Sequence, residues 1–287
     1  MGFIIAAVVI GALAIGVGLN STRGLFGLSV SQHRPEALSE LLSPAYRITR
    51  PDGDGPFATA LLFSGCDGPK DNLERLAGEL KQAGWASVIV DSHAPRGYGD
   101  AEAWRLICAG QLLNGAERAA DVAVALNDAR AMPFVDAERI GLVGASHGGW
   151  AVLDFLAQYD ADTRPPILRA WPDSLVDQGL DGVEAVALLY PYCGPTSVVA
   201  HNGWTSPVPA LFLLVEGDTV TGERDCLRLA ERMRARGLVA ETELYPNVTH
   251  GFDQETKAPL STLIYAPEEA ARAHARIIAF LEAASAD

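Results

Sequence analysis

Short apolar runs of strand length alternate with amphipathic segments of helix length along most of this chain. Runs such as residues 87–90 and 211–215 are almost wholly apolar, which is typical of strands that are buried on both faces. Between the runs, apolar residues recur at helical spacing, as Leu73, Leu76 and Leu80 do. This alternation predicts an α/β domain, with a mostly parallel, doubly wound sheet flanked by helices.

The alternation covers residues 44–287 without an internal repeat or a low-complexity tract. We therefore predict one domain over residues 44–287, a polar connector over residues 23–43 and a separate hydrophobic segment over residues 1–22. Strands are expected at 45–50, 58–63, 86–90, 140–143, 184–189, 210–215 and 240–244, and helices at 71–83, 116–131, 148–159, 223–236 and 267–284.

Composition excludes several classes of protein. Hydrophobic residues make up 49% of the 287 residues, so the chain is not intrinsically disordered. The net charge of −14 repels polyphosphates, and we expect no nucleic-acid partner. Four cysteines are too few for a disulfide framework in a chain of this length. They do not stand at zinc-ligand spacing either, so we expect no metal site.

The N-terminal segment differs in kind from the rest. Its seventeen residues from Phe3 to Leu19 carry no charge and would form a helix of about 26 Å, close to the thickness of a bilayer core. No basic residue precedes this run, which favours a retained membrane anchor over a cleaved signal. We predict a chain that is anchored in a membrane or exported to the periplasm. Arg23 and Arg34 weakly favour a cytoplasmic domain, so the side stays open.

The sharpest motif is Gly144-Ala145-Ser146-His147-Gly148, which stands between a predicted strand and a predicted helix. Glycines on both sides of a serine permit a tight strand-to-helix turn that lifts the hydroxyl above the sheet. A glycine-rich structural turn is the alternative. The placement favours Ser146 as a nucleophile.

A serine nucleophile needs a base, and the base needs an orienting carboxylate. In this strand–turn–helix arrangement the acid and then the histidine follow the serine, each past a late strand. Asp218 and His250 fit that order. Glu216 is an alternative acid, although it stands closer to the strand end. His93 is an alternative base, although it precedes the serine.

The negative charge of an acyl-transfer intermediate requires fixed N–H donors. The backbone N–H of His147 follows the nucleophile and is one candidate. The other is the N–H of Cys66, within Ser64-Gly65-Cys66-Asp67-Gly68. Because only the backbone is needed, the Cys66 side chain is expected to be an inert thiol, and Cys66→Ala is expected to retain activity within about tenfold.

Five separated blocks follow one another along the chain, at residues 64–68, 90–97, 144–149, 190–194 and 249–252. Together these blocks resemble the dienelactone hydrolase family of α/β-hydrolases. The resemblance implies an α/β-hydrolase fold with an eight-stranded type of sheet, no cofactor, and hydrolysis of small esters or lactones. Two departures stand out: Ser146 replaces the cysteine nucleophile of the founding members, and Ser64 replaces the histidine that commonly precedes the oxyanion-loop glycine.

Further positions are candidates for the substrate pocket. Arg96 could pair with a substrate carboxylate, although pairing with Asp91 within its own turn is the favoured interpretation. Trp150 and Tyr192 are candidate pocket walls by position alone. Residues 193 and 226 are cysteines that would pair only in an exported domain, and the sequence leaves this open.

These residues predict a serine hydrolase that acts on small-molecule carboxylic esters or lactones and is bound to a membrane through its N-terminal helix. A peptidase or an acyl transferase could use the same three residues. A catalytically silent binding module is a different class, and the intact Ser146, Asp218 and His250 argue against it.

Overall fold

The computed structural model describes residues 2–29, 31–257 and 261–285. Within them, a seven-stranded sheet has the order β1-β3-β2-β4-β5-β6-β7. Only the edge strand β1 is antiparallel to its neighbour, and all other pairs are parallel. The strands are β1 (Arg47–Thr49), β2 (Phe57–Phe63), β3 (Ala86–Val90), β4 (Val135–Ala145), β5 (Val183–Leu189), β6 (Ala210–Val215) and β7 (Ala240–Tyr245).

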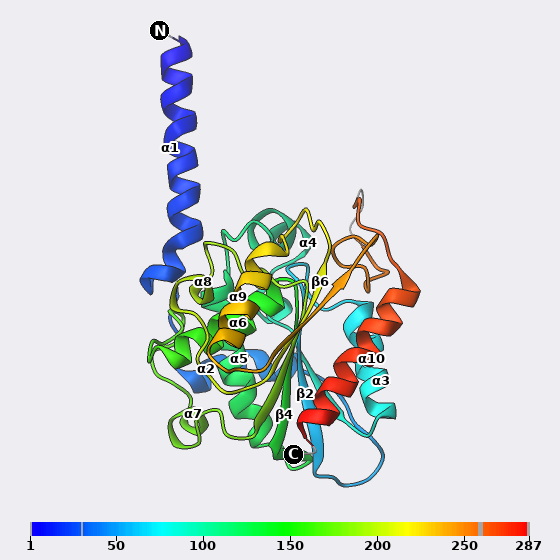
Figure 1. The fold of residues 1–287 in the computed structure, drawn as a ribbon. Helices are drawn as coiled ribbons and strands as arrows, with labels where there is room; N and C mark the ends of the chain where they lie inside the picture. Colours follow the sequence, from blue (N-terminus) through cyan, green and yellow to red (C-terminus); the bar gives the residue numbers. More distant parts are fainter. Residues whose placement is uncertain (1, 30, 258–260, 286–287) are drawn as a thin grey trace.

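Helices cover both faces of this sheet (Figure 1). Helices α3 and α10 pack on one face, and α2, α5, α6 and α9 pack on the other. The helices are α1 (Gly2–Thr22), α2 (Pro35–Leu42), α3 (Asp71–Gln82), α4 (Asp100–Glu102), α5 (Gly115–Arg130), α6 (His147–Asp160), α7 (Asp173–Asp177), α8 (Val198–Asn202), α9 (Arg224–Ala235) and α10 (Pro267–Ala284). The mostly parallel α/β fold predicted from the sequence is confirmed.

The central strands explain why their sequences are apolar throughout. In β2, Leu61 and Phe63 pack into the core on one face, while Ala60 and Leu62 pack into the core on the other. Because successive side chains of a strand point to opposite faces, both sets must be apolar. The sheet has one strand fewer than the family resemblance implies. Among the described residues, the segment before the edge strand β1 forms helix α2 (Pro35–Leu42) and adds no strand to the sheet.

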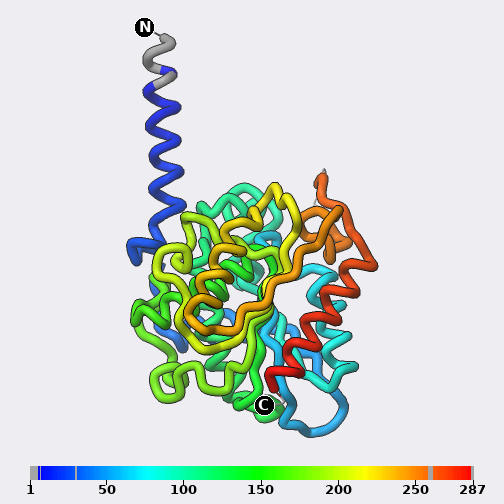
Figure 2. The backbone as a smooth tube through the Cα atoms, viewed as in Figure 1, coloured from blue at the N-terminus to red at the C-terminus, as the bar shows by residue number. Residues whose placement is uncertain are grey.

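Helix α1 projects away from the domain (Figures 1 and 2). Its described side chains over residues 8–19 are exposed, including Ile10, Leu13 and Leu19. The stretch Val8–Phe26 has a mean hydropathy of 1.4 and only 11% of it is buried. This helix is apolar and long enough to be a membrane anchor or a signal sequence.

The segment predicted to be a connector packs against the domain. Helix α2 places Leu38 and Leu42 in the core, both fully buried. Nearer the start of the segment, Arg23 forms an ion pair with Glu117 of α5, and the two side chains are only 8% and 1% exposed. The end of α1 is therefore fixed to the body of the protein through buried contacts.

Candidate active site

Ser146 occupies the sharp turn between β4 and α6. Its backbone has φ of 52° and ψ of −114°, a conformation that is strained for a residue with a side chain. The flanking glycines make the turn possible. A Cβ on Gly148 would lie 2.2 Å from the carbonyl oxygen of Phe63, and one on Gly144 would lie 2.6 Å from Gly149 Cα. The serine hydroxyl is thereby presented at the carboxyl end of the sheet.

The loops after β6 and β7 bring two further side chains to this serine. His250 Nε2 lies 2.8 Å from Ser146 Oγ, and His250 Nδ1 lies 2.7 Å from Asp218 Oδ2. The three side chains form a continuous hydrogen-bonded chain from hydroxyl to carboxylate. Such a chain can remove the hydroxyl proton as the oxygen attacks a carbonyl carbon.

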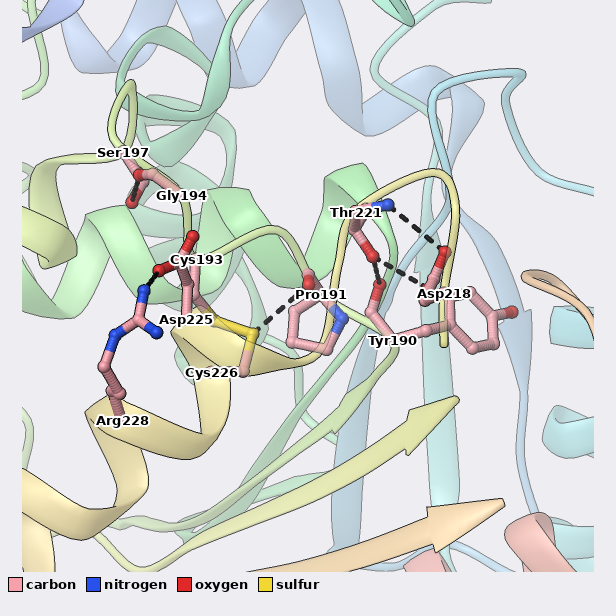
Figure 3. Close-up of a disulfide and its surroundings, with 10 residues drawn as sticks. All are labelled: Tyr190, Pro191, Cys193, Gly194, Ser197, Asp218, Thr221, Asp225, Cys226 and Arg228. Carbon is pink, nitrogen blue, oxygen red and sulfur yellow. Dashed lines mark hydrogen bonds and ion pairs between the residues drawn. A yellow bond between two sulfur atoms is a disulfide. The ribbon is translucent and has the colours of Figure 1, made fainter. Parts of the chain in front are cut away.

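Asp218 is held by its own loop as well as by His250. The N–H groups of Val220 and Thr221 donate to Oδ1 at 2.7 and 3.2 Å, and the Thr221 hydroxyl donates to Oδ2 at 2.9 Å. Figure 3 shows the bonds from Thr221. Burial alone raises the pKa of Asp218, but the hydrogen bond with His250 and those from the loop outweigh it and lower the pKa below its ordinary value. The carboxylate therefore stays ionised at neutral pH.

The two alternative residues lie elsewhere. Glu216 is exposed to solvent. His93 is buried, and neither of its ring nitrogens has a hydrogen-bond partner among the described residues. Burial and the nearby charges of Arg118 and Arg96 lower the pKa of His93 to about 3, so it stays neutral and is not bonded to Ser146.

The predicted N–H donors border the serine. His147 is the first residue of α6, whose leading N–H groups have no partner within the helix; both His147 and Cys66 line the cavity above Ser146. Gly65 is close enough that a Cβ there would lie 3.8 Å from Ser146 Cβ. We expect the amides of Cys66 and His147 to face the developing charge.

Arg118 holds the loop that contains Ser64, Gly65 and Cys66, a role that the sequence analysis did not predict. It is fully buried and donates to the Ser64 carbonyl at 2.8 Å and to the Ser64 hydroxyl at 3.1 Å. Its Nη1 also lies 3.1 Å from His147 Nδ1. Burial lowers the pKa of Arg118 to about 10, so it stays charged at neutral pH. The serine that departs from the family pattern is thus fixed by a buried guanidinium.

A cavity of about 550 Å³ opens above Ser146. Trp150 and Tyr192 line it, with their rings in edge contact at 4.9 Å between centroids. Arg96 does not line it. Its guanidinium makes two hydrogen bonds to the buried carboxylate of Asp121, at 2.6 and 2.9 Å. The prediction of Arg96 as a pocket residue is therefore corrected, and its partner is Asp121 rather than Asp91.

Comparisons with known proteins show which families the chain resembles. The model of the dienelactone hydrolase family matches residues 174–285, and that of the prolyl oligopeptidase family matches residues 77–161. A Klebsiella pneumoniae protein that bears the name dienelactone hydrolase superposes with a TM-score of 0.59 at 19% identity, covering 83% of this chain and 92% of its own. The chain has the α/β-hydrolase fold, and its residues 174–285 resemble the dienelactone hydrolases.

Other proteins that this chain resembles carry the names of esterases and peptidases. A propionate-bound esterase from Thermogutta terrifontis has a TM-score of 0.58 at 13% identity, covering 82% of this chain and 88% of its own. Dipeptidyl-peptidase 5 of Porphyromonas gingivalis is 25% identical over 194 residues, or 63% of this chain, but the chain spans only 28% of that protein's length. The solved structures that share this fold include an esterase and a dipeptidyl peptidase of Porphyromonas gingivalis.

Both cysteine pairs of the chain are oxidised. Cys66 bonds to Cys108, and Cys193 bonds to Cys226, with Cα separations of 4.9 and 5.2 Å. The second bond ties α9 to the segment that follows Tyr190 (Figure 3). The expectation of an inert Cys66 thiol is wrong, because its sulfur joins the oxyanion loop to the cavity wall at Cys108. Pairing partners are not encoded in cysteine spacing, so the sequence held no signal for this bond.

Removing each disulfide in turn separates its effect on the site from its effect on stability. The two disulfides close loops of 42 and 33 residues. Because each restricts the unfolded chain, each should stabilise the folded protein by about 4 kcal/mol. We expect the Cys66→Ser, Cys108→Ser double variant and the Cys193→Ser, Cys226→Ser double variant to lose similar stability in thermal denaturation. Only the first should lower kcat/KM, by about tenfold. Equal kcat/KM losses in both variants would contradict this assignment.

Behind His250 lies a buried polar network. The Tyr190 ring contacts the His250 ring at 4.6 Å between centroids, and the Tyr190 hydroxyl donates to Asp253. The Asp253 carboxylate also lies 3.7 Å from His274 Nε2, and Glu79 lies 3.0 Å from His274 Nδ1. Burial lowers the pKa of His274, but the two carboxylates outweigh it and raise the pKa to about 9.

This network predicts a loss of stability in alkali. Because the folded-state pKa of His274 is about 9 and the unfolded value is about 6.5, its stabilisation is complete below about pH 6.5 and is lost as the pH rises through about 9. Between about pH 7 and 10, the free energy of unfolding should fall by about 2–3 kcal/mol more in the wild type than in His274→Gln. Urea denaturation at both pH values tests this, and equal falls would contradict it.

Proposed function

We propose that this chain is a serine hydrolase that cleaves carboxylic esters or lactones through an acyl-enzyme on Ser146. The observation that carries the proposal is the hydrogen-bonded chain Ser146–His250–Asp218 at the floor of the cavity. Ser146 is the nucleophile and His250 is the base. Asp218 orients the His250 ring, and its negative charge stabilises the imidazolium that forms. No cofactor is needed for this chemistry.

The reaction runs in two halves. His250 Nε2 takes the proton as Ser146 Oγ bonds to the ester carbonyl carbon, and the N–H groups of His147 and Cys66 stabilise the oxyanion. The C–O bond to the alcohol then breaks, and His250 returns the proton to the departing oxygen. Water, activated by the same histidine, adds to the acyl-enzyme and releases the carboxylic acid and Ser146.

Peptide hydrolysis is the second candidate. The match of residues 77–161 to the prolyl oligopeptidase family and the similarity to dipeptidyl-peptidase 5 favour it. A substrate panel separates the two functions: purified protein is assayed with aliphatic esters, lactones, and dipeptidyl amides that carry the same chromogenic leaving group. We expect kcat/KM for esters to exceed that for amides by at least a hundredfold, and the reverse order would favour the peptidase.

We further propose that α1 is a retained anchor and that the domain lies on the exported side of the membrane. Disulfides persist in oxidising compartments, and all four cysteines are paired. Arg23, which favoured a cytoplasmic domain, is buried against Glu117 and is therefore a structural charge. Without reductant, a thiol-alkylating reagent should label none of the four cysteines of the membrane-bound protein. Labelling of all four in freshly lysed cells, or a full-length protein that does not sediment with membranes, would contradict this.

A further inference from the structure

The candidate active site lies directly beside the base of the apolar helix. Ser21, in the last turn of α1, lines the same cavity as Ser146. The apolar run ends at Leu19, and two residues of helix rise by about 3 Å. The cavity wall therefore begins within one helical turn of the end of the apolar segment.

Hydrogen bonds from the last turn of α1 and from Arg23 hold α1 in this position. Asn20 Nδ2 donates to the carbonyl oxygen of Gln111 at 2.7 Å, and Gln111 Nε2 bonds to the Ser21 hydroxyl. Arg23 Nε donates to Glu117 at 3.0 Å and Arg23 Nη1 donates to the Gln111 carbonyl at 3.0 Å. Gln111 follows Ala109 and Gly110, which line the cavity. The anchor is thus bonded to the cavity wall, and its direction fixes which face of the domain meets a bilayer.

Exposed apolar side chains surround this corner of the molecule. Trp104 and Val220 line the cavity and remain 45% and 57% exposed, and Ile264, next to the lining residue Leu263, is 65% exposed. Phe26, which follows α1, is 72% exposed. Helix α4 and the loop after β7 lie at the end of the domain from which α1 projects (Figure 1). Apolar side chains at the base of an anchor are suited to the headgroup region of a membrane.

We propose that the cavity mouth rests on the membrane surface and that its substrates are esters dissolved in the bilayer, whose acyl chains enter between the apolar rim residues. The proposal rests on the serine hydrolase function and on α1 as an anchor, both proposed above. The occupant of the rim is a lipid surface rather than a protein partner, because the anchor brings this face to the bilayer in every molecule. A bilayer-dissolved ester then reaches Ser146 without crossing water.

The test compares two esters in one preparation. Full-length protein is reconstituted in phosphatidylcholine vesicles and assayed with 4-nitrophenyl acetate, which is dissolved in water, and with 4-nitrophenyl palmitate, which is dissolved in the vesicles. Ile264→Asp places a charge on the rim without touching the cavity lining, and Val176→Asp places one on α7, where Val176 is 69% exposed. We expect Ile264→Asp to lower the palmitate rate at least tenfold and leave the acetate rate within about twofold, and Val176→Asp to change neither.

A second variant moves the domain without changing its surface. Inserting about ten Gly and Ser residues between Leu19 and Asn20 separates the domain from the anchor by a root-mean-square distance of about 17 Å and retains the Asn20 and Ser21 contacts. The palmitate rate should again fall while the acetate rate holds. Unchanged palmitate rates in both variants would overturn the inference. A wild-type protein that hydrolyses neither ester would contradict the proposed function, and the inference would fall with it.

Discussion

Ser146→Ala and His250→Ala are each expected to lower kcat for ester hydrolysis by at least about a thousandfold, and the double variant is expected to lose little more. Residues that act as one unit are not additive, because removing either one leaves only binding and the oxyanion donors. Asp218→Asn should lower kcat by a comparable or somewhat smaller factor, since the amide cannot stabilise the imidazolium.

The matched control for the base is His93→Ala. His93 is the other buried histidine considered for this role, and neither of its ring nitrogens is hydrogen-bonded among the described residues. Its replacement should change kcat by less than about tenfold. Steady-state kinetics with a soluble ester measures all five variants. An inactive His93→Ala beside an active His250→Ala would reverse the assignment of the base.

Arg23→Met is expected to destabilise the fold by about 3–5 kcal/mol, because it leaves the Glu117 carboxylate buried without its cation. Glu117 is 1% exposed, and its remaining donors among the described residues are the Asn114 N–H at 3.1 Å and the Ser29 hydroxyl at 2.9 Å. Adding Glu117→Gln should recover part of the loss, because glutamine keeps the helix-capping bond to Asn114 without the charge. Urea denaturation measures each variant.

An exposed ion pair supplies the control for this prediction. Arg139 lies 2.7 Å from Asp136, with side chains 42% and 24% exposed, and Arg139→Met should cost no more than about 1 kcal/mol. Equal losses of unfolding free energy in Arg23→Met and Arg139→Met would show that the buried pair stabilises the fold no more than an exposed one. The Arg23–Glu117 pair also limits how far the chain can be shortened. A chain that begins near Ser31 loses Arg23 and Ser29, which both bind Glu117. A soluble fragment should therefore begin at Asn20.

The sequence predicted the parts of the molecule that local pattern encodes. Both-face burial makes β2 and β6 apolar, and the turn at Ser146 requires glycines at fixed positions. Strand ends then brought Asp218 and His250 to the serine, because the carboxyl ends of parallel strands share one edge of the sheet. The assignment of a catalytic role to these residues stays a prediction.

What the sequence did not reveal depends on partners far along the chain. Arg96 pairs with Asp121 on α5 rather than within its own turn, and Cys66 pairs with Cys108. Neither pairing can be recognised from the local sequence. A guanidinium can bind any carboxylate, and a thiol can bond to any other thiol, that the fold brings close to it. Helix α2 is different. Its Leu38 and Leu42 stand at helical spacing, a signal that was present in the predicted connector.

Labelling of the full-length protein with a fluorophosphonate tests the central claim most directly. The reagent phosphonylates a serine only when that serine is activated as a nucleophile. Mass spectrometry of the digested protein should place one adduct on the peptide that contains Ser146, and the adduct should be absent from His250→Ala and retained in His93→Ala. No adduct in the folded wild type, or an adduct on a different residue, would contradict the account of this chain as a hydrolase that acts through Ser146.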